Sequence, residues 1–243
     1  MLMFRTYHAT QKRYMADKRG YDEDWFYKTF GIDAEIIIDH AWGIEPCTIK
    51  QIKSYQPSNN SLCEGQVLSE PYPFKKARII VQEMVGALAF QMMEKKVATD
   101  SLTLIINYDR ESVDNGSYHG EVQVDYYGRK VPKTAHGTVK LDAPTNLCSQ
   151  LTDPLIKLYD KIVDKNLTVR RVTVNANRVL PDTGIVQVDL FTDTKKLEKE
   201  KRLQETMLAL KQKYNKNAIM RGVSYEEGAT MRERNNQVGG HKA

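Results

Sequence analysis

The sequence predicts an α+β fold: a small helical N-terminal segment, then a four-stranded antiparallel sheet with two helices on one face. Three observations predict it. The spacing of apolar residues is helical before residue 57 and changes after a polar stretch at 50–61. Strands and helices then follow in the order β-α-β, insertion, β-α-β, which is the split βαβ arrangement. After residue 181 the chain becomes highly charged and only partly helical.

The composition leaves several function classes open and argues against others. Of 243 residues, 36 are Lys or Arg and 31 are Asp or Glu, so the net charge of +5 permits binding to a polyanion without requiring it. Three scattered cysteines, with no C-x-x-C and no histidine pair at ligand spacing, argue against a zinc site or a disulfide framework. No signal-like start and no stretch of about 20 apolar residues is present. We therefore expect a cytoplasmic protein that does not bind a membrane.

Residues 1–57 are expected to form a helical segment of their own. Gly31 interrupts an apolar, helix-like run, and Asp33 is a suitable N-cap for a new helix over 34–41. Gly43 is placed to end that helix. The polar linker at 50–61 then marks the boundary with the next domain.

Residues 58–181 are expected to form the sheet domain. Pro73 suits the first turn of a long helix, and Asp153 is the expected N-cap of a second. The strands are identified by alternating β-branched residues. The expected strands cover 61–72, 101–109, 133–142 and 168–181, the helices cover 73–98 and 153–163, and a polar, aromatic insertion covers 110–132. The apolar positions expected on the helices are Ile80, Met84, Ala87, Leu88, Gln91 and Met92 on the first and Leu155, Leu158, Tyr159 and Ile162 on the second.

Two helices on one side of a sheet leave its other face open to a partner. We expect Arg170, Thr173 and Asn175 of the last strand to line that face. The alternative is that they are ordinary solvated strand residues.

Residues 182–243 are expected to form a tail. A short amphipathic helix is predicted over 200–214, with Leu203, Met207, Leu210 and Tyr214 on one stripe. Residues 228–243 lack apolar periodicity, which predicts flexibility.

Three blocks in a fixed order resemble Y-family translesion DNA polymerases of the UmuC/ImpB/DNA polymerase IV type. "SLCEGQVLSEPY" and "TVRRVTVNANRVLP" resemble the first and last strands of the little-finger domain. "TFGIDAEIIIDHAWGIEP" resembles the end of the preceding thumb domain. The resemblance covers about residues 20–243 and implies a partial thumb, a complete little finger and a tail.

The resemblance implies a protein that binds damaged duplex DNA without sequence readout, in DNA repair, translesion synthesis and the SOS response. Donors on the open face would contact phosphate oxygens. Of the paired arginines on the last strand, only one side chain can point to each face, so one is the stronger candidate. Glu64, near the first strand, is an unexpected residue for such a surface. The candidate DNA-binding residues are Arg170, Arg171, Thr173, Asn175, Ser61, Lys133, Thr134 and His136.

The chemistry of nucleotide transfer is not expected in this chain alone. In the full-length family, palm carboxylates hold two Mg²⁺ ions, and no such carboxylate block is found here. We therefore expect no catalytic residue and no cofactor. A split polymerase, with palm and fingers encoded separately, is one alternative.

The insertion carries Tyr118, Tyr126 and Tyr127. Base stacking is one interpretation of these tyrosines, and packing on the sheet is the other. A second alternative function, an RNA-binding or protein-interaction module, would place aromatic residues on the central strands, where only Tyr108 occurs.

The segment "QVDLF" resembles the pentapeptide with which bacterial DNA-processing enzymes dock on the sliding clamp. Adjacent Leu190 and Phe191 would enter an apolar pocket of the partner, while Gln187 satisfies a polar site and Asp189 fits the pattern between them. The alternative is a linker whose Leu-Phe pair packs on its own domain.

Overall fold

The computed structural model describes residues 23–31, 33–45, 47–55, 60–125, 128–183, 193–238 and 241–242. The chain forms two compact units, residues 1–58 and 59–243, and the division falls one residue beyond the expected position. None of the helices in the described ranges is long and apolar enough to cross a membrane.

The first unit contains three described helices. They are α2 (Glu23–Phe30), α3 (Asp33–Trp42) and α4 (Ile49–Ser54). Gly31 between α2 and α3 has φ 59°, and Gly43 after α3 has φ 81°, so both glycines adopt the left-handed conformation that ends a helix. Among the described residues of this unit, the buried core consists of Phe26, Ala34 and Ile38.

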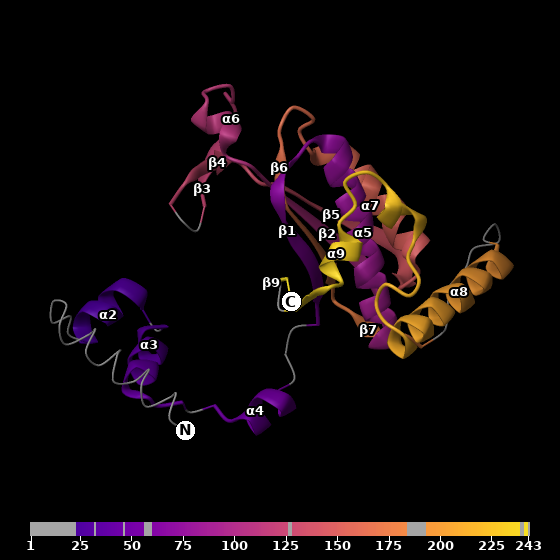
Figure 1. Ribbon diagram of the computed structural model, residues 1–243, viewed down its shortest axis with the longest axis horizontal. Coiled ribbons are helices and arrows are strands. Elements are labelled where there is room, and N and C mark those ends of the chain that lie inside the picture. The colour runs from indigo at the N-terminus through magenta and orange to yellow at the C-terminus, as the bar shows by residue number, and fades with distance from the viewer. Residues whose placement is uncertain are drawn as a thin grey trace. The chain divides into compact units, whose positions relative to one another are not determined.

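The second unit is built on an antiparallel sheet. Its strand order is β1 (Leu62–Tyr72), β6 (Val169–Asn177), β2 (Val97–Tyr108) and β5 (Ala135–Thr145). Helix α5 (Phe74–Glu94) joins β1 to β2, and α7 (Cys148–Ile162) joins β5 to β6. Strands β1 and β2 therefore run parallel with antiparallel β6 between them, and β5 and β6 run parallel with antiparallel β2 between them. This is the split βαβ arrangement. Both helices lie on the same side of the sheet (Figure 1), and the predicted α+β fold class is confirmed.

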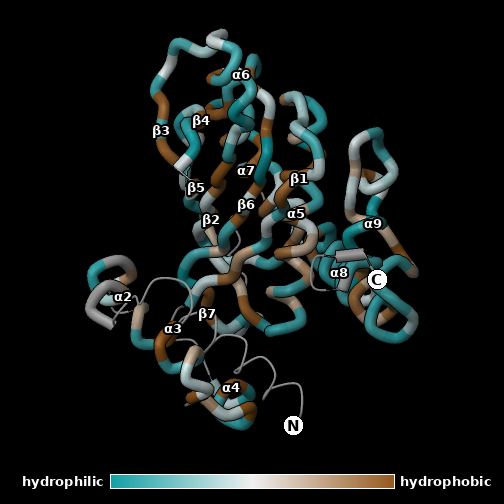
Figure 2. Tube along the Cα trace, turned by 60° about the vertical axis from the view of Figure 1, so that its left-hand side comes forward, coloured by the Kyte–Doolittle hydropathy of each residue, from teal (hydrophilic) through white to brown (hydrophobic). Residues whose placement is uncertain are grey.

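The main core lies between the sheet and the two helices. On α5, Ile80, Met84, Leu88 and Met92 are fully buried at a spacing of four, as the sequence predicts. The predicted positions Ala87 and Gln91 are only partly buried. Hydrophobic segments mark the strands and α7, and also α3 and α4 of the first unit (Figure 2).

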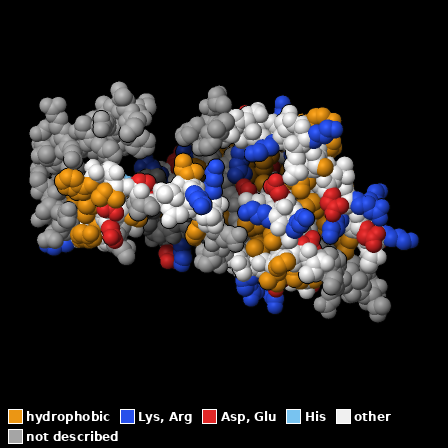
Figure 3. Space-filling view, turned by 90° about the horizontal axis from the view of Figure 1, so that it is seen from below, with side chains coloured by type: hydrophobic (Ala, Val, Ile, Leu, Met, Phe, Trp, Pro, Cys, Tyr) orange, Lys and Arg blue, Asp and Glu red, His pale blue; other side chains and the backbone are white. Residues whose placement is uncertain are grey.

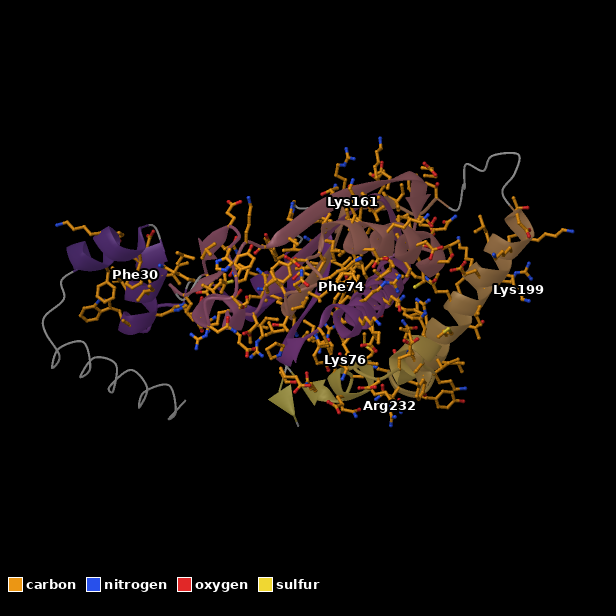
Figure 4. All side chains as sticks on the ribbon, turned by 90° about the horizontal axis from the view of Figure 1, so that it is seen from above. Phe30, Phe74, Lys76, Lys161, Lys199 and Arg232 are labelled. Carbon is orange, nitrogen blue, oxygen red and sulfur yellow. The ribbon has the colours of Figure 1, made fainter. Side chains whose placement is uncertain are left out.

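The two helices meet at Phe74 and Tyr159. Their ring centroids are 4.8 Å apart, and the Tyr159 hydroxyl donates to the Phe74 carbonyl at 2.8 Å. Figure 4 labels Phe74, which is the first residue of α5 and is partly buried. Burial raises the pKa of Tyr159 far above its ordinary value, so the hydroxyl stays protonated and remains a donor.

The start of α7 differs from the prediction. The helix begins at Cys148, and Asp153, the expected N-cap, lies inside it next to Pro154. The N–H of Cys148 instead donates to Gln204 Oε1 at 3.0 Å. Gln204 belongs to α8 (Thr194–Lys213), so the cap comes from a residue 56 positions away in sequence and not from a local residue.

The last predicted strand is divided in two. Strand β6 ends at Asn177, and the left-handed φ of 45° at Arg178 turns the chain. Strand β7 (Leu180–Pro181) then pairs with the start of β2.

The insertion folds as a small excursion between β2 and β5. It contains α6 (Glu111–Asp114) and a hairpin of β3 (Val122–Val124) and β4 (Lys130–Pro132). Tyr118 packs against the main core and donates to the Glu121 carbonyl at 3.2 Å, which favours packing over base stacking. Tyr126 and Tyr127 lie outside the described residues.

Only part of the predicted apolar stripe of α8 packs. Leu203 is 59% exposed and Tyr214 is 63% exposed, whereas Met207 and Leu210 are partly buried and Gln204 is 5% exposed. Gln204 is buried because its amide spans two backbone groups, the Cys148 N–H and the Asn146 carbonyl. A polar residue therefore docks the helix, which a search for hydrophobic periodicity cannot detect.

The predicted flexibility of residues 228–243 is wrong for most of that segment. Residues 222–238, the C-terminal strap, include a 3₁₀ turn η1 (Gly222–Tyr225), α9 (Met231–Arg234) and β8 (Gln237–Val238), which pairs with β9 (His241–Lys242). Glu83 of α5, 3% exposed, accepts the N–H groups of Thr230 at 2.9 Å and Met231 at 3.1 Å. Figure 4 shows the strap, with Arg232, next to the Lys76 end of α5. Hydrogen bonds to a buried carboxylate, together with the packing of Met231 against the main core, hold this segment.

We predict that Glu83→Ala lowers the free energy of unfolding by roughly 2–4 kcal/mol, because two partly buried N–H groups lose a charged acceptor. Urea denaturation of the whole chain measures it. The control Glu226→Ala changes an exposed glutamate of the same strap and should cost less than about 0.5 kcal/mol. Equal losses in the two variants would show that Glu83 does not hold the strap.

Candidate nucleic-acid interface

The helices cover one face of the sheet, and side-chain alternation decides what the other face presents. On β6, Val172 and Val174 point into the core and are fully buried. Arg171, Thr173 and Asn175 alternate with them and point to the opposite face. We call this side the open face, because none of the described helices of this unit packs on it.

The open face combines residues from four strands. Most are polar and small, and the exposed ones are Arg171, His136, Thr138 and Lys140, together with Val67 and Cys63 at the edge. The face is made of Cys63, Gly65 and Val67 from β1, Arg171, Thr173, Asn175 and Asn177 from β6, Ser101, Thr103, Ile105 and Asn107 from β2, and His136, Thr138 and Lys140 from β5.

The two arginines on β6 have different surroundings. Between Arg171 and Val169 the pairing with β2 slips by one residue, so Arg170 is the extra residue of a bulge. Its guanidinium donates to the Ser69 carbonyl at 3.1 Å and lies 4.0 Å from the Asp109 carboxylate. No ion pair is recorded for Arg171 within the described ranges. Arg171 is therefore the stronger candidate of the pair.

The other predicted residues differ in their accessibility. Thr173 is only 7% exposed, although Asn175 beside it is partly exposed. Ser61 is exposed just before β1, and Lys133 is exposed but paired with Glu121 at 2.7 Å. His136 is exposed on the open face, opposite Ile105.

Glu64, the unexpected acidic residue near the first strand, does not belong to the open face. It points to the helix side, where Arg234 of the strap donates to it at 3.0 Å. Its neighbour Cys63 does lie on the open face, and burial followed by the Glu64 charge raises the pKa of that thiol. The thiol is therefore neutral near pH 7.

Side-chain hydrogen bonds connect the polar residues across three strands. Asn177 Nδ2 donates to Ser101 Oγ at 3.1 Å and to Thr103 Oγ1 at 2.9 Å. Thr103 Oγ1 lies 2.8 Å from Thr138 Oγ1. Thr103, Thr138 and Asn177 were not among the predicted residues. Strand alternation could have identified Thr138, because it lies two residues after His136 and so faces the same side of the sheet.

The described open face carries no Phe, Tyr or Trp side chain. Tyr108, the aromatic residue that the sequence places at the end of a central strand, is 6% exposed and lies in the core, where its hydroxyl accepts the Asp164 N–H at 2.9 Å. A stacking platform of the RNA-binding kind does not fit this surface.

Charges elsewhere on the second unit are mixed. Figure 3 shows Lys and Arg side chains interspersed with acidic ones on the side seen from below. Among the residues that the structure describes, no group of three or more His, Cys, Asp or Glu side chains could hold a metal ion.

The predicted clamp-docking residues Gln187, Asp189, Leu190 and Phe191 lie outside the described residues. The chain on either side is described. Before them, the Asp182 N–H donates to the Lys96 carbonyl at 2.8 Å. After them, Asp193 caps α8 by accepting the Lys196 N–H at 3.1 Å.

The chain is similar in sequence to UvrX of Bacillus subtilis (strain 168), a protein named for UV-damage repair. The two are 24% identical over 217 residues, which is 89% of this chain and 46% of UvrX. The chain thus spans about half the length of this curated relative. No family model matches it.

Solved polymerase structures also align with the chain. A binary complex of Dbh DNA polymerase is 14% identical, over 68% of this chain and 40% of that one, with a TM-score of 0.33. The little-finger domain of PolIV in complex with the β-clamp is 10% identical, over 54% and 99%, with a TM-score of 0.33. DinB from Sulfolobus solfataricus is 16% identical, over 68% and 40%, with a TM-score of 0.29.

Because these TM-scores are below 0.5, the fold is argued from the strand order and from the side of the sheet on which the helices pack. Three observations agree with the resemblance of the three sequence blocks to Y-family polymerases. They are the strand order, the helices on one side of the sheet and the similarity to UvrX. Over the length that it covers, this chain resembles the C-terminal part of a Y-family translesion DNA polymerase.

Proposed function

We propose that the second unit grips duplex DNA through the phosphate backbone, using the open face of its sheet. The observation that carries this proposal is the uncovered face itself, on which exposed Arg171, His136 and Lys140 surround small polar side chains. Hydroxyl, amide and guanidinium groups donate to phosphate oxygens without reading the base sequence.

Small side chains in the centre of this face suit a large, flat partner. Ser101 and Thr103 are 7% and 8% exposed, so they do not project, and a backbone can approach the sheet closely. The cations lie around them, which places charge where neighbouring phosphates would pass.

We further propose that residues 187–191 dock the chain on the sliding clamp. The support is chemical: two adjacent large apolar side chains, Leu190 and Phe191, follow a glutamine whose amide can satisfy a polar site on the partner. The tether would hold the DNA grip close to replicating DNA.

In this proposal the chain acts in DNA damage tolerance as the non-catalytic part of a translesion polymerase. The chain spans 46% of UvrX, so palm and fingers, with the carboxylates for Mg²⁺, would come from a separate segment. A split polymerase assembled in this way remains the alternative to a binding module that acts alone.

We predict that the chain binds duplex DNA of arbitrary sequence, with an affinity that falls steeply as salt increases. Arg171→Gln should weaken binding and reduce the slope of log K against log[salt] by about 0.9, the value for one lost phosphate contact. Fluorescence anisotropy with a labelled duplex measures both. Arg202→Gln, which changes an exposed arginine of α8 that pairs with Glu198, is the matched control and should leave the slope unchanged. Absence of binding at low salt would refute the DNA grip.

We predict that the double variant Leu190→Ala, Phe191→Ala loses affinity for a purified bacterial sliding clamp by at least about 100-fold, since both anchors leave their pocket. Surface plasmon resonance on immobilised clamp measures it. DNA affinity should be unchanged in the same variant. Clamp affinity equal to that of the unaltered chain would exclude the docking peptide.

A further inference from the structure

We propose that the hydroxyl groups of Thr134 and Thr138 are phosphate contacts, held as hydrogen-bond donors by the amide side chains behind them. The inference rests on the proposed DNA grip and deepens it. It assigns the edge strand β5 a row of uncharged donors, in addition to the cationic contact at Arg171 on β6.

Thr134 lies just before β5 and is partly exposed. Its Oγ1 lies 2.9 Å from Asn107 Nδ2 and 2.6 Å from Gln123 Nε2. An amide nitrogen can only donate, so these two bonds occupy both lone pairs of the hydroxyl oxygen. The Thr134 hydroxyl can therefore form one more hydrogen bond, in which it donates its own proton.

Thr138 is also directed as a donor, through a chain of bonds that occupies one lone pair of its oxygen. Asn177 Nδ2 donates to Thr103 Oγ1, which lies 2.8 Å from Thr138 Oγ1. Thr103 is 8% exposed, and within the described ranges these are the two side chains bonded to its hydroxyl. A buried, unpaired O–H group is costly, so the Thr103 proton is donated to Thr138. The proton of exposed Thr138 is then directed to solvent.

The two hydroxyls lie in one row. Residues 134, 136, 138 and 140 alternate to the same face, so at about 3.4 Å per residue Thr134 and Thr138 are roughly 14 Å apart. His136 lies between them and Lys140 follows. The row is two strands from Arg171, or about 10 Å across the sheet.

A hydroxyl held as a donor selects its ligand. Phosphate oxygens accept hydrogen bonds and do not donate, whereas the N–H groups of an extended peptide would meet no acceptor at Thr134. The ligand chemistry that fits the row is therefore a phosphate backbone.

Uncharged donors have a distinctive thermodynamic signature. They add affinity without adding a cation, so their loss does not change the number of counterions released. This separates them from Arg171, whose loss changes both affinity and salt slope.

The test is Thr134→Val and Thr138→Val, alone and together, in the whole chain. Valine has nearly the shape of threonine and lacks the hydroxyl. Anisotropy with a labelled duplex should show affinity reduced about tenfold per hydroxyl, as expected for bonds to charged acceptors, with an unchanged salt slope. Thr134→Ser and Thr138→Ser keep the donor and should retain the affinity. Thr206→Val, at an exposed threonine of α8 that donates to the Arg202 carbonyl, is the control and should have no effect.

A separate variant tests the hydrogen bonds that connect Asn177, Thr103 and Thr138. Thr103→Val removes the group that orders Thr138 and should weaken binding roughly threefold, again without a slope change, while Thr103→Ser restores it. Thermal unfolding of each variant verifies that the fold persists.

The outcomes separate this inference from the proposed function. A chain that binds duplex DNA but shows equal affinity in the double valine variant overturns the hydroxyl row and leaves the DNA grip standing. A reduced salt slope in the valine variants also overturns it. A chain that binds no DNA at low salt overturns both.

Discussion

The structure depends on the packing of two helices against a single face of a four-stranded sheet. Fully buried residues of α5, such as Ile80 and Met84, meet Val172 and Val174 of the central strand β6. Burial of this apolar surface supplies the main driving force for folding. Both α5 and α7 pack on one side of the sheet, so the opposite side presents hydroxyl, amide and cationic side chains. This asymmetry creates the surface proposed to bind DNA.

The helix layer is completed by polar contacts from the end of the chain. Gln204 of α8 caps α7, and Glu83 of α5 receives the backbone of the C-terminal strap at Thr230 and Met231. Unsatisfied buried groups are costly, so such contacts define one arrangement more sharply than apolar packing does. Strand alternation puts Glu64 on the helix side, away from the open face, and Arg234 of the strap pairs with it there.

The open face divides its proposed work between two kinds of donor. Arg171 contributes long-range attraction that salt screens, whereas the hydroxyls act only at contact distance. Amide side chains behind Thr134 and Thr138 fix the direction of those hydroxyls before any ligand arrives, so less rotational freedom is lost on binding. A face of this kind favours the phosphate backbone and is indifferent to base sequence.

The amino-acid sequence by itself determined the element order, the alternation on β6 and the two glycine helix ends at Gly31 and Gly43, because period and backbone preference are local properties. Only the tertiary structure decided where α7 begins, which side of α8 packs and that the strap is ordered. Those outcomes depend on Gln204 and Glu83, polar residues whose partners lie about 50 to 150 residues away, and no local pattern encodes such a pairing.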